Sequence, residues 1–367
     1  MKKRNNKTLI LSGQDIQQIV LHFGHDLIMD SLISRLTSAI EHFDPDKTIV
    51  PVRSGLHYDF PASGLIEWMP LLDEREHVMI KVVGYHPSNP DTNGFPTILS
   101  TVSLYDTSSG HLQGLMDGVL LTALRTAAAS AIASKYLAHT KSAVLGLIGC
   151  GNQAVTQLHG LSRIFDLKQV LIYDIDHSAM RSFEHRCSVL NIGVDIFHST
   201  IDDLIKVSDI VCTASSIEVG KGPLFNNLIA QPHIHINAVG SDFPGKIEIP
   251  LDLLQKSFVC PDFTAQAKIE GECQQLTEQE IGPDIIKVLK NPELYAHIKN
   301  QHSVFDSTGW ALEDQVAMEL FMEYASELEL GQEVEIENVM EDAKNPYHFL
   351  NTSLTKIQSS FKKTMVH

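Results

Sequence analysis

Four charged residues in the first 125 positions each stand in an apolar or small-residue context, namely Arg53, Glu67, Lys81 and Arg125. Lys81 lies within the run VMIKVV and is the hardest to interpret as a surface residue. A charge buried without a partner is strongly unfavourable, so such residues pair with one another or bind a ligand. The residue types leave both alternatives open. Three cations and one carboxylate would suit an amino acid, because guanidinium and ammonium groups bind its carboxylate.

Asp242 is a candidate acid/base. The strand-like residues 234–239 end in GSDFPGK, so Asp242 is predicted at the carboxyl edge of a strand, where open α/β sheets bind ligands. A carboxylate in this position could instead form an Asx turn or cap a helix. Beside a bound nicotinamide it could move protons to and from a substrate amine or water.

A glycine-rich turn follows the apolar run 144–148 and reads GCGNQA. Gly149 would permit a sharp turn into a helix, Gly151 would let a pyrophosphate approach the backbone, and Ala154 would allow close helix packing. The first amides of that helix would hold the phosphates. Asp174 ends a second strand 25 residues after Gly149, where a carboxylate binds the adenosine ribose and repels a 2′-phosphate. The pattern therefore predicts NAD rather than NADP.

Strand-like segments alternate with helical ones from residue 143 onward, which predicts a doubly wound parallel sheet. The predicted strands are residues 143–148, 169–174, 194–198, 209–213, 233–239, 257–261 and 303–306.

Residues 48–105 form extended segments broken by Pro and Gly, which indicate a sheet of a different, mixed domain. A long Ala-rich helix is expected at 116–137, an amphipathic helix at 311–330, and a polar, partly disordered end from Glu333. The predicted fold class is α/β. A Rossmann NAD-binding domain spans 131–314, and a mixed α+β substrate-binding domain combines 1–130 with 315–367.

The chain has 367 residues, of which 43% are hydrophobic and 20% charged, with a formal net charge of −17. Such acidity argues against nucleic acid or an anionic membrane as a partner, because a polyanion would be repelled. No apolar run is long enough to span a membrane, and the apolar stretch 8–11 is too short for a signal peptide. A cytoplasmic enzyme is expected.

The cysteines at 150, 187, 212, 260 and 273 are widely scattered and lack CxxC spacing, which is typical of reduced thiols. His233 and His235 alternate in PHIHIN. They could form a metal pair, but polar positions on a half-buried strand are the favoured interpretation. We expect no metal site.

Taken together, these residues resemble the ornithine cyclodeaminase/μ-crystallin family over about residues 50–330. The segments that carry the resemblance are GLIEWMP (64–70), Lys81 with GYHPSN (84–89), GFPT (94–97), LTALRTAA (121–128), GCGNQA (149–154), HINAVGSDFPGK (235–246), IEGECQQL (269–276) and FDSTG (305–309).

The resemblance implies conversion of L-ornithine to L-proline and ammonia, with tightly held NAD that is reduced and reoxidised within one turnover. It implies Asp242 as the catalytic acid/base, and a homodimer formed through the first domain. The implied substrate contacts are Arg53, Glu67, Lys81, Arg125 and Ser307. The implied cofactor contacts are Thr97, Arg125, Gly149, Gly151, Asn152, Gln153, Ala154, Asp174, Ala214, Ala238, Val239, Gly240, Ser241 and Lys246.

Other functions share this fold. An amino-acid or opine dehydrogenase or a ketimine reductase would release the altered cofactor instead of recycling it, and a non-catalytic NAD-binding or storage protein would need no acid/base. Lysine or diaminobutyrate could replace ornithine. Phe95, Pro96, Ser241 and the bulky Trp68 depart from the usual pattern and are expected to affect side-chain specificity.

Overall fold

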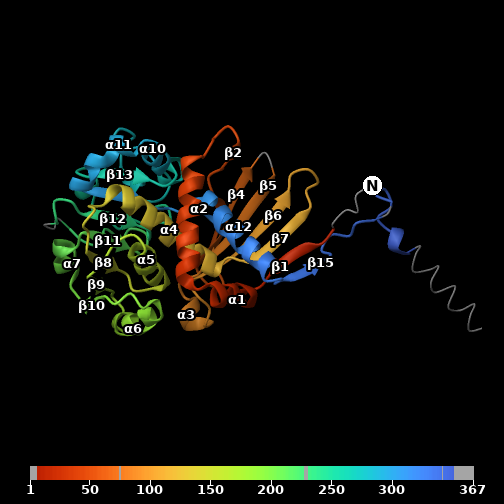
Figure 1. The fold of residues 1–367 in the computed structure, drawn as a ribbon, viewed down its shortest axis with the longest axis horizontal. Helices are drawn as coiled ribbons and strands as arrows, with labels where there is room; N and C mark the ends of the chain where they lie inside the picture. The colour runs from red at the N-terminus through yellow and green to blue at the C-terminus, as the bar shows by residue number, and fades with distance from the viewer. Residues whose placement is uncertain (1–5, 74–75, 227–229, 341, 351–367) are drawn as a thin grey trace, which may run out of the picture.

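The computed structural model describes residues 6–73, 76–226, 230–340 and 342–350, and they form two sheets joined by a long helix. A parallel sheet built from residues after 143 lies at one end of the molecule, and a mixed sheet at the other (Figure 1). Helix α4 (Val119–Leu137) lies between them. We call the two parts the parallel-sheet region and the mixed-sheet region. Within the described residues, no helix combines the length and apolar character that crossing a membrane requires.

The parallel sheet has seven strands in the order β10-β9-β8-β11-β12-β14-β13, and all neighbours are parallel. This is the predicted doubly wound sheet, and each predicted strand is present within one or two residues of its expected ends. The strands are β8 (Val144–Ile148), β9 (Gln169–Tyr173), β10 (Asp195–His198), β11 (Ile210–Thr213), β12 (His235–Ala238), β13 (Phe258–Pro261) and β14 (Ser303–Asp306).

Hydrophobic clusters lie on both faces of this sheet because successive side chains of each strand alternate between the faces. Leu145 and Leu147 pack with α5 and α6 on one side, whereas Ile148 packs with α7 on the other. The helices of this region are α5 (Asn152–Ser162), α6 (His177–Cys187), α7 (Ile201–Val207), α8 (Leu251–Leu254), α9 (Thr264–Ala267), α10 (Ile285–Lys290) and α11 (Pro292–Tyr295), with 3₁₀ turns at Ser188–Leu190, Glu272–Gln275 and Ala296–Asn300.

The mixed sheet has eight strands, of which seven follow the order β15-β1-β7-β6-β5-β4-β2 and the eighth, β3, pairs with β4. Only the β1–β7 pair is parallel among those described. The strands are β1 (Thr8–Leu11), β2 (Thr48–Ile49), β3 (Ser54–Tyr58), β4 (Gly64–Asp73), β5 (His77–Tyr85), β6 (Ile98–Asp106), β7 (Leu112–Asp117) and β15 (Gln332–Val334). Residues 8–11, which are too short for a signal peptide, therefore form β1. This strand lies between β7 and β15.

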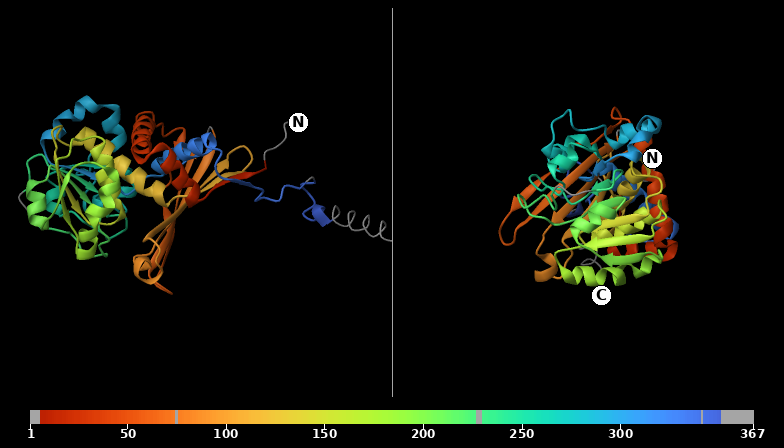
Figure 2. Two further views of the ribbon diagram at one scale, coloured as in Figure 1. Left: turned by 60° about the horizontal axis from the view of Figure 1, so that its bottom comes forward. Right: turned by 90° about the vertical axis from the view of Figure 1, so that its left-hand side faces the viewer.

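Helices cover one face of the mixed sheet (Figure 2). They are α1 (Gly13–Phe23), α2 (His25–Glu41), α4 and α12 (Ala311–Glu327), while the short α3 (Asn89–Thr92) lies in the β5–β6 connection. Their cluster of buried residues continues into the parallel-sheet region through Phe305 and Cys260, so one core extends across both regions. The small residues of α4 allow close contacts, since a Cβ on Gly160 of α5 would lie 2.7 Å from the Ala127 carbonyl oxygen.

The structure corrects several expectations about the helices. Helix α4 begins at Val119 because residues 112–117 belong to β7. Helix α12 ends at Glu327 and is buried over most of its circumference, so it is not an ordinary amphipathic surface helix. The proposed domain limits at 130 and 315 fall inside α4 and α12, and the division itself stays a prediction. The two N-terminal helices, α1 and α2, were not predicted.

The histidines of PHIHIN also differ from expectation. His235 is fully buried rather than half-buried, and its ring lies 2.8 Å from Ser303 Oγ and 3.2 Å from Asn237 Oδ1. Burial lowers the pKa of His235 to about 4, so this ring is neutral at physiological pH. His233 precedes β12 and lies 2.9 Å from the Asp209 carboxylate.

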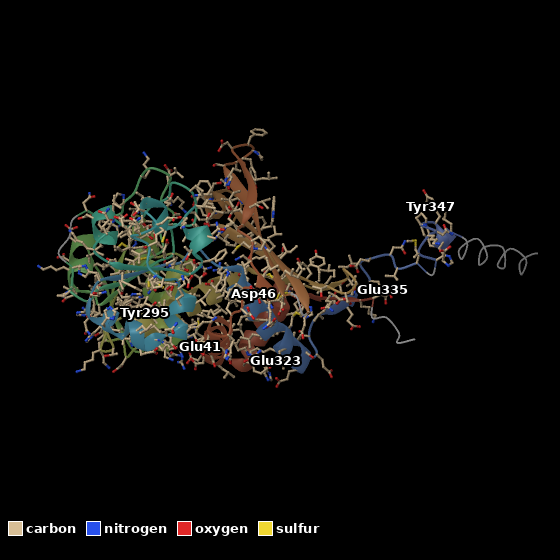
Figure 3. The ribbon with its side chains drawn as sticks, turned by 90° about the horizontal axis from the view of Figure 1, so that it is seen from above. Glu41, Asp46, Tyr295, Glu323, Glu335 and Tyr347 are labelled. Carbon is tan, nitrogen blue, oxygen red and sulfur yellow. The ribbon has the colours of Figure 1, made fainter. Side chains whose placement is uncertain are left out.

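The C-terminal segment leaves the mixed sheet after β15. Glu335 and Tyr347 lie along a stretch that projects from the body of the molecule (Figure 3). Near its start, Glu337 accepts a hydrogen bond of 2.9 Å from the backbone amide of Leu112. The disorder expected for the end of the chain concerns mostly residues 351–367, which lie outside the described residues.

Candidate active site

The carboxyl ends of the parallel strands form one row. Tyr173, Ile148, Thr213, Ala238 and Asp306 are in register across five adjacent strands. The residues that follow them therefore lie side by side at the edge where open α/β sheets bind their ligands. In strand order they are Asp174, Gly149, Ala214, Val239 and Ser307, all of which were predicted as site residues.

The glycine turn after β8 has the backbone that a dinucleotide requires. Gly149 has φ +96°, and a Cβ there would lie 2.5 Å from the Ala214 carbonyl oxygen, so a larger residue is excluded. A Cβ on Gly151 would meet no atom within 4 Å, and α5 starts at Asn152 without a side-chain cap. The exposed start of α5 thus offers free space and uncapped amides to an anion. Gln153 and the buried Ala154 continue its first turn.

Asp174 directly follows β9 and supports the glycine turn. Its Oδ2 accepts a 2.7 Å hydrogen bond from the Cys150 amide, and its Oδ1 accepts one of 2.8 Å from the Asp176 amide. A carboxylate oxygen can accept more than one hydrogen bond, so capacity remains for two ribose hydroxyls.

Replacing Asp174 with Ser is expected to weaken NAD binding roughly tenfold or more and to admit NADP, because a charged acceptor is lost and the 2′-phosphate is no longer repelled. Titrations of both nucleotides, followed by protein fluorescence, measure the change. Asp166→Ser, which removes an exposed carboxylate before β9, is the control. An unchanged preference in Asp174→Ser would show that the ribose is held elsewhere.

Asp242 lies four residues after β12 and is paired with Lys246. The Lys246 ammonium donates a 2.6 Å hydrogen bond to Asp242 Oδ1, and its Nζ lies 5.0 Å from the centre of the Tyr85 ring. Lys246 was predicted as a cofactor contact; in the structure its partner is the candidate acid/base. About a third of the Asp242 side chain is exposed, at 32%, so Oδ2 is accessible to a small molecule.

Arg53 joins the two regions and sits among carboxylates. Its Nε lies 2.9 Å from Glu270 Oε1, and its Nη1 lies 3.6 Å from Glu67 Oε2. Burial raises the pKa of Glu270 to about 8, the charges of Glu67 and Asp242 add to this, and Arg53 opposes it. Burial likewise raises the pKa of Glu67 against the effect of Arg53. The charges of Glu67, Asp242 and Glu270 therefore interact here. The three residues come from β4, the loop after β12 and the segment after α9.

Lys81 and Arg125 form a second ionic cluster with the start of α12. Lys81 Nζ lies 2.9 Å from Asp314 Oδ2, and Arg125 lies 2.5 Å from Glu313 Oε2 and 3.2 Å from Asp314 Oδ1. Burial, followed by the charge of Arg125, lowers the pKa of Lys81 to about 8, although Asp314 opposes the shift. Burial raises the pKa of Glu313 to about 7, and Arg125 opposes it. The buried cations identified in the sequence therefore all have acidic partners.

The turn after β14 brings the two ionic clusters together. Arg53 donates through Nη2 to the backbone carbonyls of Thr308 and Gly309. A Cβ on Gly309, whose φ is +91°, would lie 2.7 Å from Arg125 Nη1. Ser307 is buried, and its Oγ has no hydrogen-bond partner among the described residues. This buried hydroxyl directly precedes the two residues that contact the guanidinium groups, and because it has no partner it is a candidate for a ligand contact.

The loops of this edge are held by the buried carboxylate of Glu248, which was not predicted as a site residue. Glu248 accepts hydrogen bonds from Thr213 Oγ1 at 2.7 Å, the Ser215 amide at 2.9 Å and the Gly240 amide at 3.0 Å. It thereby connects the ends of β11 and β12 beside Asp242. Ser241 is also buried, and its Oγ donates to the Lys246 carbonyl at 2.6 Å. This loop is therefore held rigid from both sides.

The remaining predicted contacts divide between the two regions. Thr97 immediately precedes β6, and its carbonyl accepts a 2.8 Å hydrogen bond from the His86 amide, next to Tyr85.

Trp68 does not face the site. It alternates with the buried Glu67 along β4 and lies on the opposite, open face with 38% of its surface exposed. The expectation that Trp68 affects specificity directly is therefore wrong.

Glu270, Glu313 and Asp314 are further site residues that sequence reasoning missed. Glu270 lies inside the 269–276 segment, and the pair Glu313 and Asp314 interrupts an otherwise apolar stretch. Lys81 was predicted from the same pattern, a charged residue within an apolar stretch. The pattern would also have predicted Glu313 and Asp314.

A parallel sheet in this strand order, with a glycine turn after β8 and a carboxylate after β9, defines a Rossmann-type nucleotide-binding protein. The second sheet adds a buried cluster of cations and carboxylates at the same edge. More specifically, the chain belongs to the ornithine cyclodeaminase/mu-crystallin family, whose model matches residues 15–329.

Several relatives are similar over nearly the whole chain. An L-lysine cyclodeaminase from Streptomyces rapamycinicus is 38% identical over 342 residues, which are 93% of this chain and 99% of the relative. A solved lysine cyclodeaminase, described as recognising L-lysine, L-ornithine and L-2,4-diaminobutyric acid, is 44% identical with a TM-score of 0.90, covering 93% of this chain and 99% of its own. An archaeal alanine dehydrogenase dimer, solved with NAD bound, is 28% identical with a TM-score of 0.77 over 90% of this chain and all of its own.

Proposed function

We propose that this protein is an NAD-using cyclodeaminase of L-diamino acids, which converts L-ornithine to L-proline, or L-lysine to the six-membered homologue, with release of ammonia. The observation that carries the proposal is a group of three interacting carboxyl side chains: Glu67 and Glu270 lie beside Arg53, and the charge of Asp242 acts on both of them. A substrate with a single ammonium group can pair with one carboxylate. A substrate with two ammonium groups can pair with several carboxylates.

The cations orient the substrate. Arg53 and Arg125 carry five N–H donors each, and their acidic partners use only part of this capacity. The Nε groups of both are buried without an aligned hydrogen bond among the described residues. In this proposal these donors, Lys81 and Ser307 Oγ hold the α-carboxylate. Fixing one end of the substrate turns the reaction at the α-carbon into an oriented step within one complex.

The nucleotide is held by the turn 149–154, by Asp174 and by the residues that end β11 and β12. When bound, NAD supplies an acceptor for a hydride from the α-carbon and returns the hydride at the end of the turnover. Asp242 first takes a proton from the α-ammonium group, because only a neutral amine can form an imine. The side-chain amine then attacks the imine carbon, and Asp242 returns the proton as ammonia leaves.

Lys246 positions Asp242 for this role. Because its ammonium binds Oδ1, the other oxygen, Oδ2, is the one available for the proton. The terminal amine must lose a proton before it attacks, and Glu270, with its pKa raised to about 8, is a suitable acceptor within the same cluster. Glu67 and Asp242 are the other candidates for accepting this proton, and the sequence does not choose between them.

The size of the diamino acid remains part of the proposal. Ornithine was the predicted substrate, whereas similarity to lysine cyclodeaminases favours a protein that also accepts the longer chain. We therefore expect both substrates to react. We also propose a cytoplasmic location, in agreement with five cysteines that are all buried and free.

The decisive experiment supplies purified protein with L-ornithine or L-lysine and a catalytic amount of NAD. We expect cyclic imino acid and ammonia in equal amounts, far in excess of the NAD present, with no lasting absorbance of NADH. Mass spectrometry identifies the product and its ring size. If neither diamino acid reacts, the proposed activity is wrong.

An amino-acid dehydrogenase or ketimine reductase is the second candidate, favoured by similarity to the alanine dehydrogenase. It would produce NADH in proportion to substrate consumed, or consume NADH with an imine, and the same assay detects both. Turnover that stops when the NAD is used up would support this alternative.

The open face of the mixed sheet supports a proposed homodimer. Leu56, Ile66 and Leu99 are exposed in one cross-strand row, and Trp68 and Val82 are paired in the next, with exposures of 37–65%. Exposed apolar surface of this kind is typical of protein interfaces. The relative solved with NAD is a dimer.

Trp68→Glu is expected to convert the dimer to a monomer, because a charge would be buried at the centre of the open face. Size-exclusion chromatography with light scattering measures the mass. Leu21→Glu, on the exposed side of α1 in the same region, is the control and should leave the dimer intact. A dimeric Trp68→Glu protein would place the interface elsewhere.

A further inference from the structure

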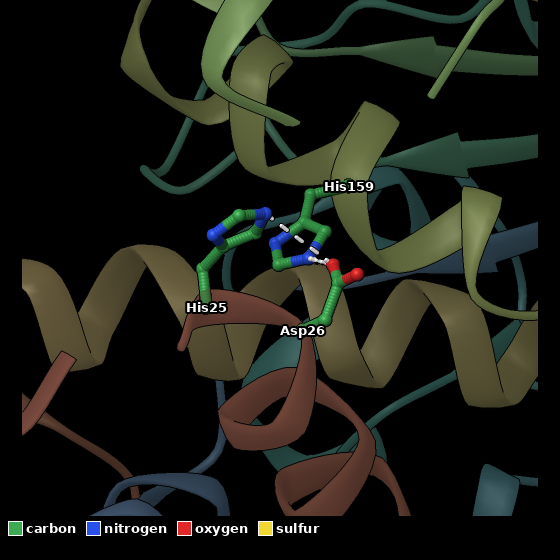
Figure 4. Close-up of side chains that lie close together, drawn as sticks. All are labelled: His25, Asp26 and His159. Carbon is green, nitrogen blue, oxygen red and sulfur yellow. Dashed lines mark hydrogen bonds and ion pairs between the residues drawn. The ribbon is translucent and has the colours of Figure 1, made fainter. Parts of the chain in front are cut away.

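A group of metal-ligating side chains lies where α2 meets α5, outside the candidate active site. His25 and Asp26 are the first two residues of α2, and His159 lies on α5. Their side chains point toward one another (Figure 4). The three residues offer one ligand atom each, and these atoms all lie within 4.8 Å of one another. The function proposed above makes no use of this group.

We propose that His25, Asp26 and His159 form a binding site for a divalent transition-metal ion of the zinc type, which links the mixed-sheet region to the parallel-sheet region. Two imidazoles and one carboxylate form a ligand set that zinc uses with an open fourth position. The partial exposure of His25 and Asp26 leaves room for water as the fourth ligand.

The observed distances fit a tetrahedral ion. Metal–ligand bonds of the zinc type place neighbouring ligand atoms about 3.3 Å apart in a tetrahedron. Asp26 Oδ1 lies 3.0 Å from His159 Nε2 and 3.4 Å from His25 Nε2. Two of the three edges are therefore close to this length, and the third pair of ligand atoms lies within 4.8 Å.

The charges around the group also fit a cation. Arg163 Nη1 lies 3.0 Å from Asp26 Oδ2, the carboxylate oxygen that does not pair with the two histidines. Asp30 in turn pairs with Arg163 through hydrogen bonds of 2.8 and 2.7 Å, so the two carboxylates outweigh the guanidinium. The group has a net negative charge before the ion binds.

The location gives such an ion a structural effect. Helix α5 carries the glycine turn at its N-terminus, and α2 belongs to the layer that covers the mixed sheet. An ion shared by His25, Asp26 and His159 would restrict movement of the two regions relative to each other. Binding to the folded form alone also raises the melting temperature.

Calorimetric titration of the full-length, untagged, chelator-treated protein with Zn²⁺ tests the proposal. We expect one ion per chain, a rise in melting temperature, and the visible absorption of tetrahedral Co²⁺ when Co²⁺ replaces Zn²⁺. His25→Ala, which alters a partly exposed ring, should weaken binding at least about tenfold, and His159→Gln should do the same. NAD binding by each variant verifies that it is folded.

A second histidine group provides the matched control. His139 and His233 have ring centres 4.8 Å apart, and His233 lies 2.9 Å from Asp209, yet these residues do not bring three ligand atoms together. His139→Ala should leave Zn²⁺ binding unchanged. The proposal is overturned if no binding is detected up to about 100 times the protein concentration, if His25→Ala binds Zn²⁺ as the wild type does, or if His139→Ala removes the binding.

Discussion

Asp242→Asn is expected to lower the rate of ammonia release at least about a hundredfold, because the amide cannot accept a proton from the α-ammonium group or return one to the leaving amine. The substitution preserves size and shape. NAD binding should remain close to that of the wild type, since the glycine turn and Asp174 follow other strands, β8 and β9. Initial rates with L-ornithine and L-lysine, together with an NAD titration, separate the two effects.

The effect should be specific to this carboxylate. Asp252→Asn changes a partly exposed side chain of α8 with a distant lysine partner at 3.8 Å, and should retain full activity. Rates near normal in Asp242→Asn would assign the proton transfer to another group, with Glu270 and Glu67 as the next candidates. A Glu270→Gln variant, which abolishes a carboxyl whose pKa is raised to about 8, would then distinguish between them.

Arg125→Met is expected to have the largest effect on stability, lowering the free energy of unfolding by about 3–5 kcal/mol. The guanidinium lies between Glu313 and Asp314, and its loss would leave Glu313 buried without a cation and Asp314 with Lys81 alone. Lys81 alone cannot compensate, because it is already paired with Asp314. Urea denaturation followed by circular dichroism measures the change.

A surface pair provides the comparison for this experiment. Arg35 binds Glu323 through two hydrogen bonds of 2.7 and 2.9 Å, but both side chains are exposed. Arg35→Met should therefore cost no more than about 1 kcal/mol. Equal losses of unfolding free energy in Arg125→Met and Arg35→Met would mean that the buried cluster contributes no more to stability than a surface pair. Arg125→Lys should recover part of the stability but little substrate binding, because an ammonium group lacks the two-pronged geometry of guanidinium.

The parallel sheet could be predicted from the sequence because its central strands are short and buried on both faces. Several of them therefore appear as nearly continuous apolar runs between turn residues, as in residues 144–148 and 210–213. The row of ligand-binding positions followed directly, since parallel strands end at one edge. The N-terminal helices α1 and α2 were not predicted, although Ser12 and Asp15 form a capping box at the start of α1.

The acidic half of the site was harder to predict. Arg53 and Glu270 are more than two hundred positions apart in the sequence, and only the fold brings them within 2.9 Å. His159 and Asp26, which are 133 positions apart, likewise meet only through the fold, whereas His233 and His235 stand out in the sequence because they are two positions apart. A residue type that stands out locally can be found in the sequence, but the partner that neutralises it is fixed by tertiary structure.

The order of strands in the mixed sheet constrains how the chain folds during synthesis. Strand β1 pairs with β15, so Thr8 faces Val334, and α12 supplies buried residues to the core beneath that sheet. The parallel sheet, by contrast, needs nothing beyond residue 306. Until α12 and β15 have emerged from the ribosome, the mixed sheet lacks part of the helical layer that covers one face and the partner strand at one edge. We expect chaperones to bind most readily to this incompletely folded chain.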